Sequence, residues 1–230
     1  MSIEKPKQAT VQQLEAMRLY ADLLEEAKLR INSVENALNG RIPLPGPFLH
    51  EYCFLQLRML CELIAIGCLV LHGDINKNGI GKLRGTWSAE DIIKALENIH
   101  PAFYPIPHLQ EKTSIGFNLT AFTDGYLTKD DLKHLVQLSG SHLHRGSLKK
   151  ILKGRQPTQF NFPDVLEWLK KIGKLLSTHM IPLFEEGTLV LVVLRNLQDD
   201  ERVQVAFASK PFPEDEQIPN AKKIAEGDNR

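Results

Sequence analysis

The residues that could do chemistry lie in two stretches that are far apart in the chain. Arg58 and Glu62 stand four positions apart in an otherwise apolar segment, and a later stretch carries two histidines and an arginine. If the stretches meet, a guanidinium for a phosphate, a titratable imidazole and a carboxylate share one cluster. Acid/base cleavage of a phosphodiester needs these groups. The candidate catalytic residues are therefore His144, His142, Arg58, Glu62 and Arg145.

A structural interpretation of the same residues stays open. On a helix, residues four apart lie on one face, so Arg58 and Glu62 can neutralise each other among apolar neighbours. A metal site built from His134, His142 and His144 is a third interpretation, but their spacing matches no standard metal-binding signature. We expect no metal and no cofactor.

One segment is clearly basic. Between Arg145 and Arg155 the chain has no acidic residue, whereas over the whole sequence 28 Lys and Arg balance 28 Asp and Glu. An electrostatic partner must therefore be bound by a local patch rather than by net charge. The candidate nucleic-acid-binding residues are Lys149, Lys150, Lys153 and Arg155.

The stretch 48–72 is apolar on nearly every side and predicts a buried central helix. Its uninterrupted apolar part is shorter than the roughly 20 residues that cross a bilayer, and the polar start of the chain lacks a secretory signal. We therefore expect a cytoplasmic protein that does not enter a membrane. The three cysteines, Cys53, Cys61 and Cys68, lie too far apart on this helix to pair, so we expect buried, reduced thiols.

Apolar residues recur every three or four positions in four further segments, which predicts helices over about 10–39, 88–99, 128–145 and 161–180. The proline-rich segment 101–126 predicts no regular structure beyond short extended pieces. Two β-rich runs, GTLVLVVLRN and ERVQVAFASK, predict one hairpin.

These elements predict a mainly α fold, a helical bundle around the buried central helix 48–72 with a C-terminal β-hairpin. The expected domains are a helical bundle over 1–183, an appended hairpin over 184–210 that packs on the bundle, and a disordered polar tail over 211–230.

The segments FLQLRMLCELIAIGCLV and LVQLSGSHLHRGS together resemble the HEPN-like bacterial helical families. The resemblance implies an α-helical bundle, often dimeric, that works in prokaryotic defence, toxin–antitoxin or RNA-processing settings. Active members cut RNA without a metal, using an Arg followed four to six residues later by His. No Arg stands at that distance before His142 or His144, and the nearest upstream one is Arg84.

Two functions follow. The first is a non-enzymatic helical interaction module, which the missing Arg-to-His spacing favours, and we expect it to form a homo-oligomer through a helix face or the hairpin. The alternative is a metal-independent endoribonuclease, with His144 as acid/base, Arg58 or Arg145 on the phosphate and the basic segment guiding RNA. The partners considered are a second copy, another protein or RNA.

Overall fold

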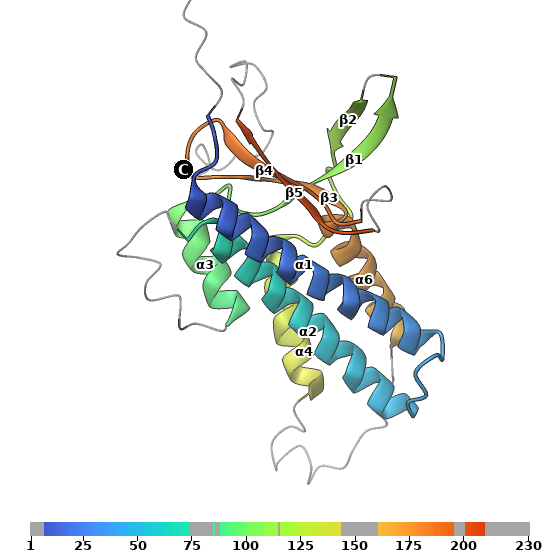
Figure 1. Cartoon of the computed structure of the whole chain (residues 1–230). Coiled ribbons are helices and arrows are strands. Elements are labelled where there is room, and N and C mark those ends of the chain that lie inside the picture. Colours follow the sequence, from blue (N-terminus) through green and yellow to red (C-terminus); the bar gives the residue numbers. More distant parts are fainter. Residues whose placement is uncertain are drawn as a thin grey trace, which may run out of the picture.

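The computed structural model describes residues 7–73, 85, 88–114, 116–143, 161–195 and 201–209. Within these ranges the chain forms five helices and five strands (Figure 1). The helices are α1 (Val11–Leu38), α2 (Gly46–Leu71), α3 (Ala89–Ile99), α4 (Lys129–Leu143) and α6 (Phe162–Leu176). The strands are β1 (Ile106–Thr113), β2 (Gly116–Ala121), β3 (Thr178–Pro182), β4 (Thr188–Val193) and β5 (Gln204–Ser209).

Helix α2 is the centre of the helical layer, which confirms the predicted buried central helix. It contacts α1, α3, α4 and α6, and its buried residues lie on several sides of the helix. By length and composition alone α2 could also cross a membrane, but 44% of its most apolar window is buried inside the protein. This burial agrees with the core helix of a soluble protein, and the cytoplasmic location stays a prediction.

Local sequence signals place the starts of two helices where the periodicity predicted them. The Thr10 hydroxyl accepts from the Gln13 amide and the Gln13 side chain accepts from the Thr10 amide, a capping box that begins α1. Thr128 and Asp131 make the same reciprocal pair before α4. These caps satisfy backbone donors that the first helical turn leaves without partners.

The first two helices approach closely because Gly67 leaves room for an aromatic ring. A Cβ added at Gly67 would lie 2.6 Å from Cε2 of Tyr20, a distance that real Cβ atoms do not tolerate. Tyr20 is itself almost fully buried. Its ring on α1 therefore occupies the space that any larger residue at this position of α2 would need.

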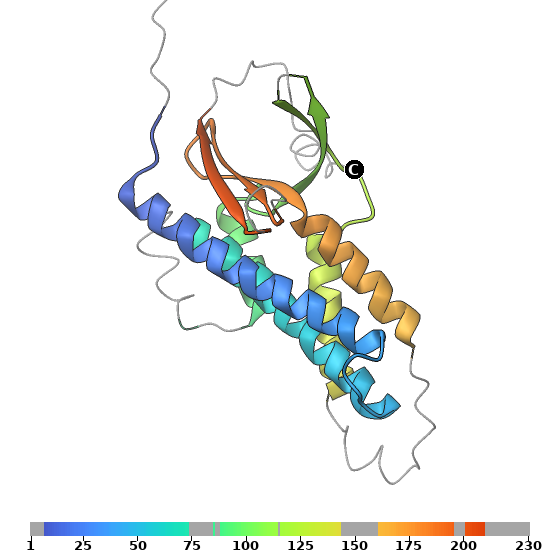
Figure 2. The same cartoon turned by 45° about the vertical axis from the view of Figure 1, so that its right-hand side comes forward.

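All five strands form one antiparallel sheet in the order β2-β1-β3-β4-β5. The helices lie on one side of it (Figures 1 and 2), where α1 contacts β5 and α6 contacts β1 and β3. His179, Ile181, Val190 and Val192 face this side and are fully buried. Alternate residues of the same strands face away from the helices.

The sheet overturns the predicted mainly α fold, because the structure mixes helices with a five-stranded sheet rather than adding one hairpin to a bundle. The hairpin over 188–209 is confirmed as β4 and β5. However, β4 also pairs with β3, and β3 pairs with β1, so the hairpin is one side of a larger sheet.

Two segments account for the error. Ile106–Thr113 and Gly116–Ala121 form β1 and β2, which are mostly exposed and therefore lack the apolar alternation that marks a half-buried strand. The last predicted helix ends at Leu176 instead of about residue 180, and Thr178–Pro182 forms β3 in the middle of the sheet. Met180 stands four residues after Leu176, so it extended the helical stripe although it belongs to a strand.

Candidate functional site

The predicted meeting of the central helix with the later helix occurs along α2 and α4. Ser139 of α4 is fully buried, and a Cβ added at Gly140 would lie 3.5 Å from Nη1 of Arg58. The small residues at these positions let the guanidinium lie against the backbone of α4. The structure therefore brings Arg58 to the helix that sequence reasoning chose as its partner.

The charge of Arg58 is paired within α2. Its Nε donates to Oε1 of Glu62 at 3.1 Å, and the two side chains are 24% and 21% exposed. A partly exposed pair one helical turn apart stabilises a helix only modestly, by about 0.2–0.5 kcal/mol. The geometry matches the structural interpretation, in which each charge neutralises the other.

His142 of α4 contacts α2 at Phe54, one helical turn before Arg58. Its ring stacks on Phe54 with centroids 4.0 Å apart and an interplanar angle of 26°. It also meets the edge of His50 at 4.8 Å. Because residues 50, 54, 58 and 62 are spaced by four, they form one ladder on the face of α2 that meets α4.

The N-terminal end of α6 contacts the His50 end of this row of residues on α2. Phe162, the first residue of α6, lies edge-on to His50 with centroids 5.9 Å apart. Burial lowers the pKa of His50, and the neighbouring His142 lowers it further, against the opposing effect of Glu51. Burial also lowers the pKa of His142, although Asp164 of α6 opposes this shift.

The protonation of the two histidines and the pairing of Arg58 decide what chemistry these residues can do. Both imidazoles favour the uncharged form at neutral pH, and the Arg58 guanidinium already has a carboxylate partner. We name Arg58, Glu62, His142, His50 and Phe54 the α2–α4 cluster. His144, Arg145, Lys149, Lys150, Lys153 and Arg155 lie outside the described residues.

A second polar network, which sequence reasoning missed, crosses the core between the helices and the sheet. The Tyr20 hydroxyl lies 2.8 Å from Nε2 of His179, and Nδ1 of His179 lies 3.2 Å from the Leu176 carbonyl. The carbonyl can only accept, so the neutral ring donates from Nδ1 and accepts from Tyr20 at Nε2. Every ring nitrogen has a partner in this form, which is typical of a structural histidine.

A third histidine contact lies at the C-terminal end of α2. Nδ1 of His72 is 2.7 Å from the Cys68 carbonyl and its Nε2 is 3.1 Å from the Pro182 carbonyl. His100 also approaches the Pro182 carbonyl, with its Nε2 at 3.2 Å. Burial lowers the pKa of His72, whereas the two carbonyls oppose that shift. These rings connect the C-terminal ends of α2 and α3 to the last residue of β3.

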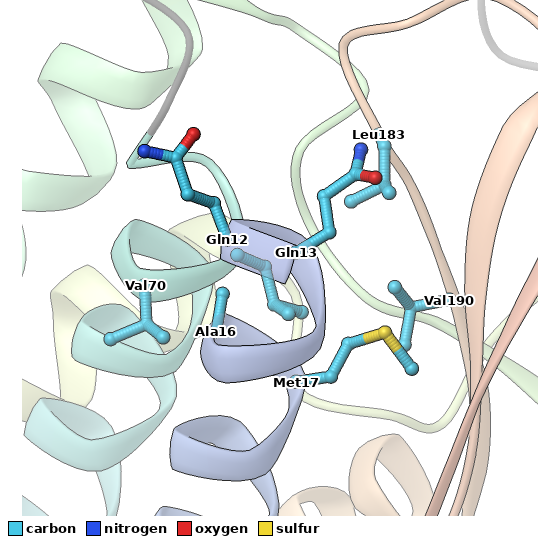
Figure 3. A pocket seen from close by; sticks show the side chains of 8 residues that line it. Gln12, Gln13, Ala16, Met17, Val70, Leu183 and Val190 are labelled. Carbon is cyan, nitrogen blue, oxygen red and sulfur yellow. The ribbon is translucent and has the colours of Figure 1, made fainter. Parts of the chain in front are cut away.

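The pocket shown in Figure 3 is too small for an organic ligand. It lies between α1, the end of α2 and the sheet, and has a volume of about 40 Å³. This is room for a few water molecules, because one water needs roughly 10–15 Å³ on this measure. Its polar side chains are the amides of Gln12 and Gln13, which do not titrate. We therefore assign it no catalytic role.

The thiols of α2 are buried, as predicted. Burial raises the pKa of Cys53 to about 11, and it raises the pKa values of Cys61 and Cys68 further. Thiols in this state are poor nucleophiles. Among the described residues, no group of three His, Cys, Asp or Glu side chains is arranged to hold a metal ion.

The exposed surface offers a candidate of another kind, a two-stranded arm formed by residues 108–113 and 116–121. Only Ile106 and Pro107 of β1 pair with β3, so the rest of β1 pairs with β2 alone. Figures 1 and 2 show this hairpin projecting from the body of the protein. Leu109 is 44% exposed and Phe117 is 57% exposed, on opposite faces of the hairpin.

Comparison with known proteins gives no match to any family model, any curated protein or any solved structure. The HEPN-like resemblance therefore stays a prediction.

Proposed function

We propose that the protein is a non-enzymatic interaction module that self-associates through the arm formed by β1 and β2. The observation that carries the proposal is the projecting hairpin, in which Leu109 and Phe117 are exposed on its two faces. A two-stranded hairpin is marginally stable alone in water. Pairing of β2 with a strand of another chain would complete its hydrogen bonding and place a neighbouring strand beside Phe117.

The edge strand β2 gives the proposal a specific geometry. It is the first strand of the sheet, and among the described strands it pairs only with β1. An exposed edge strand is a template for pairing with a further strand. Two copies related by a twofold axis would pair β2 antiparallel with β2, which extends two five-stranded sheets into one of ten strands and leaves a closed dimer.

The α2–α4 cluster supports a structural role over catalysis. Glu62 neutralises Arg58, and burial favours uncharged forms of both histidines in the described cluster. The ribonuclease alternative depends on His144, Arg145 and the basic segment, which lie outside the described residues, and it stays a prediction.

The test measures molecular mass by sedimentation equilibrium over a range of micromolar concentrations. Phe117→Lys places a charge on the apolar face of β2 and should weaken self-association at least tenfold, or by about 1.4 kcal/mol. Phe48→Lys is the matched control, because Phe48 is 59% exposed at the start of α2, far from the arm. A wild-type monomer throughout this range, or equal masses for the Phe117 and wild-type proteins, would refute the proposal.

A further inference from the structure

Two histidine rings meet at one backbone carbonyl where the helical layer joins the sheet. His72 follows the last residue of α2 as its C-cap, and His100 has the same place after α3. Nε2 of His72 lies 3.1 Å from the Pro182 carbonyl oxygen, and Nε2 of His100 lies 3.2 Å from the same oxygen. The ends of two helices and the last residue of β3 therefore converge on one point.

Hydrogen bonds between protein groups do not satisfy both nitrogens of a neutral His72 ring. Its Nδ1 lies 2.7 Å from the Cys68 carbonyl, and a carbonyl oxygen can only accept. A neutral imidazole has one N–H, so when Nδ1 donates to Cys68, Nε2 presents a lone pair to the Pro182 oxygen. His72 is 1% exposed, and burial lowers its pKa, which favours this neutral ring. Two lone pairs that face each other in the core repel unless a cation lies between them.

The three atoms are spaced as the ligands of one metal ion are. Zn²⁺ binds nitrogen and oxygen ligands at about 2.0–2.2 Å, so two ligands at an angle of roughly 90–110° lie roughly 2.8–3.5 Å apart. The two N···O distances, 3.1 and 3.2 Å, fall in this range. The ring centroids are 5.3 Å apart, close to the roughly 5 Å expected for two imidazoles bound through Nε2 at a tetrahedral angle. The N···O distances also suit hydrogen bonds, so the distinction lies in His72, whose Nε2 has no proton to donate in this tautomer.

The surroundings of the two rings favour a cation. The C-terminal end of a helix carries a partial negative charge, and both α2 and α3 end here. The contact of His72 Nδ1 with the Cys68 carbonyl is the kind that fixes the tautomer of metal-binding histidines and leaves Nε2 for the metal. Phe103 lies edge-on to His72 and Phe184 lies edge-on to His100, so aromatic contacts hold both imidazoles in place.

We propose that His72, His100 and the Pro182 carbonyl bind a divalent transition-metal ion, such as Zn²⁺, that ties the ends of α2 and α3 to β3. Imidazole nitrogen suits Zn²⁺, Cu²⁺ and Ni²⁺. Water completes the coordination, because no third His, Cys, Asp or Glu side chain in the described ranges joins these rings. The partly exposed His100 gives the ion access from solvent. The sequence alone predicted no metal, since these three residues are far apart in the chain. The site shares no residue with the arm, so the proposal is independent of self-association.

Zinc titration of the full chain, after metal has been removed with a chelator, tests the proposal. Isothermal titration calorimetry at pH 7 should show one Zn²⁺ bound per chain at micromolar concentrations. His100→Gln removes the partly exposed ligand and should weaken this binding at least tenfold. His72→Gln should do the same, and circular dichroism verifies that each variant is folded. His134→Gln is the matched control, because His134 lies on α4 beside Trp168 and its loss should leave the zinc affinity unchanged.

Nitrogen-15 NMR of the His72 ring distinguishes a metal ion from a proton. In the metal-free wild type at pH 7 we expect a proton on Nδ1 alone, and one equivalent of Zn²⁺ should shift the Nε2 resonance. A ring that is protonated on both nitrogens and keeps its resonances when Zn²⁺ is added would overturn the proposal, because a proton then occupies the place assigned to the metal. Equal zinc affinity of the wild-type and His100→Gln proteins, or a folded wild type that binds no Zn²⁺ at micromolar concentrations, would overturn it as well.

Discussion

The buried ring of His179 makes acid destabilisation of this fold measurable at one residue. The side chain is fully buried, and both ring nitrogens have hydrogen-bond partners when the ring is neutral. A proton on Nε2 would require the Tyr20 hydroxyl to accept a hydrogen bond instead of donating one, and it would place a charge in the core. Burial accordingly lowers the pKa of His179 to about 4 from 6.5.

The size of the effect follows from this difference. As the pH falls below 6.5, the unfolded chain takes up a proton at this position before the folded chain does, so the free energy of unfolding decreases. The decrease ends near pH 4, where the folded form also binds the proton. The difference of about 2.5 pH units, 6.5 minus 4, at 1.36 kcal/mol per unit gives about 3 kcal/mol.

A double difference isolates this contribution. His179→Gln replaces the titratable ring by an amide, which still has a hydrogen-bond donor and an acceptor. We expect this variant to fold at neutral pH with a lower free energy of unfolding than the wild type. Urea unfolding of the wild type and the variant is measured from pH 7 to pH 4 and extrapolated to water. Groups elsewhere titrate in both proteins and cancel. The wild type should lose about 3 kcal/mol more than the variant over this interval.

Two results would refute this reasoning. A constant difference between the two proteins from pH 7 to pH 4 would mean that His179 binds its proton equally in both states. Direct titration by NMR of the His179 ring with a midpoint near 6.5 would show that burial does not control its protonation.

Two further substitutions test the packing of the helices. Gly67→Ala should lower the free energy of unfolding by about 1–3 kcal/mol, because the added Cβ meets the Tyr20 ring, whereas Gly173→Ala in α6 meets nothing within 4 Å and should raise it by about 0.5–1 kcal/mol. Thermal unfolding of both variants should therefore give midpoint shifts of opposite sign, and equal shifts would contradict the assigned contact. Ser139→Ala should be neutral or stabilising by about 1 kcal/mol, because the buried Ser139 Oγ has no hydrogen-bond partner among the described residues. A loss above about 1 kcal/mol in urea unfolding would show that this hydroxyl has a partner.

Local signals in the sequence were enough to place the helices. The stripe from Val11 to Leu38 and the caps at Thr10 and Thr128 depend on neighbours within four residues, and the structure has each of them. The meeting of Arg58 with the small residues of α4 could also be predicted, because a long charged side chain between packed helices requires space on the facing helix.

The sheet could not be predicted in the same way because its pairing is between distant segments. The arm has few buried positions, so nothing in its pattern distinguishes a strand from a loop. The short strand β3 is defined by its partners β1 and β4, which lie on either side of it in the sheet but apart in the chain. The hydrogen bond between Tyr20 and His179 joins residues 159 positions apart, so it cannot be predicted from neighbouring residues in the sequence.

The residues spaced by four on α2 would come together both in a structural cluster and in a phosphate-binding site, so the sequence alone cannot distinguish these two interpretations. Every fourth residue from His50 to Glu62 faces α4, so polar groups on this face meet whether or not they do chemistry. Convergence of Arg58, Glu62 and His142 is therefore expected from helix packing alone. What distinguishes a phosphate-binding site from a structural pair is an available charge, and Glu62 already neutralises Arg58 within the described cluster. Among the described residues, Leu109 and Phe117 are exposed apolar side chains on the arm, which is where we expect another chain to bind.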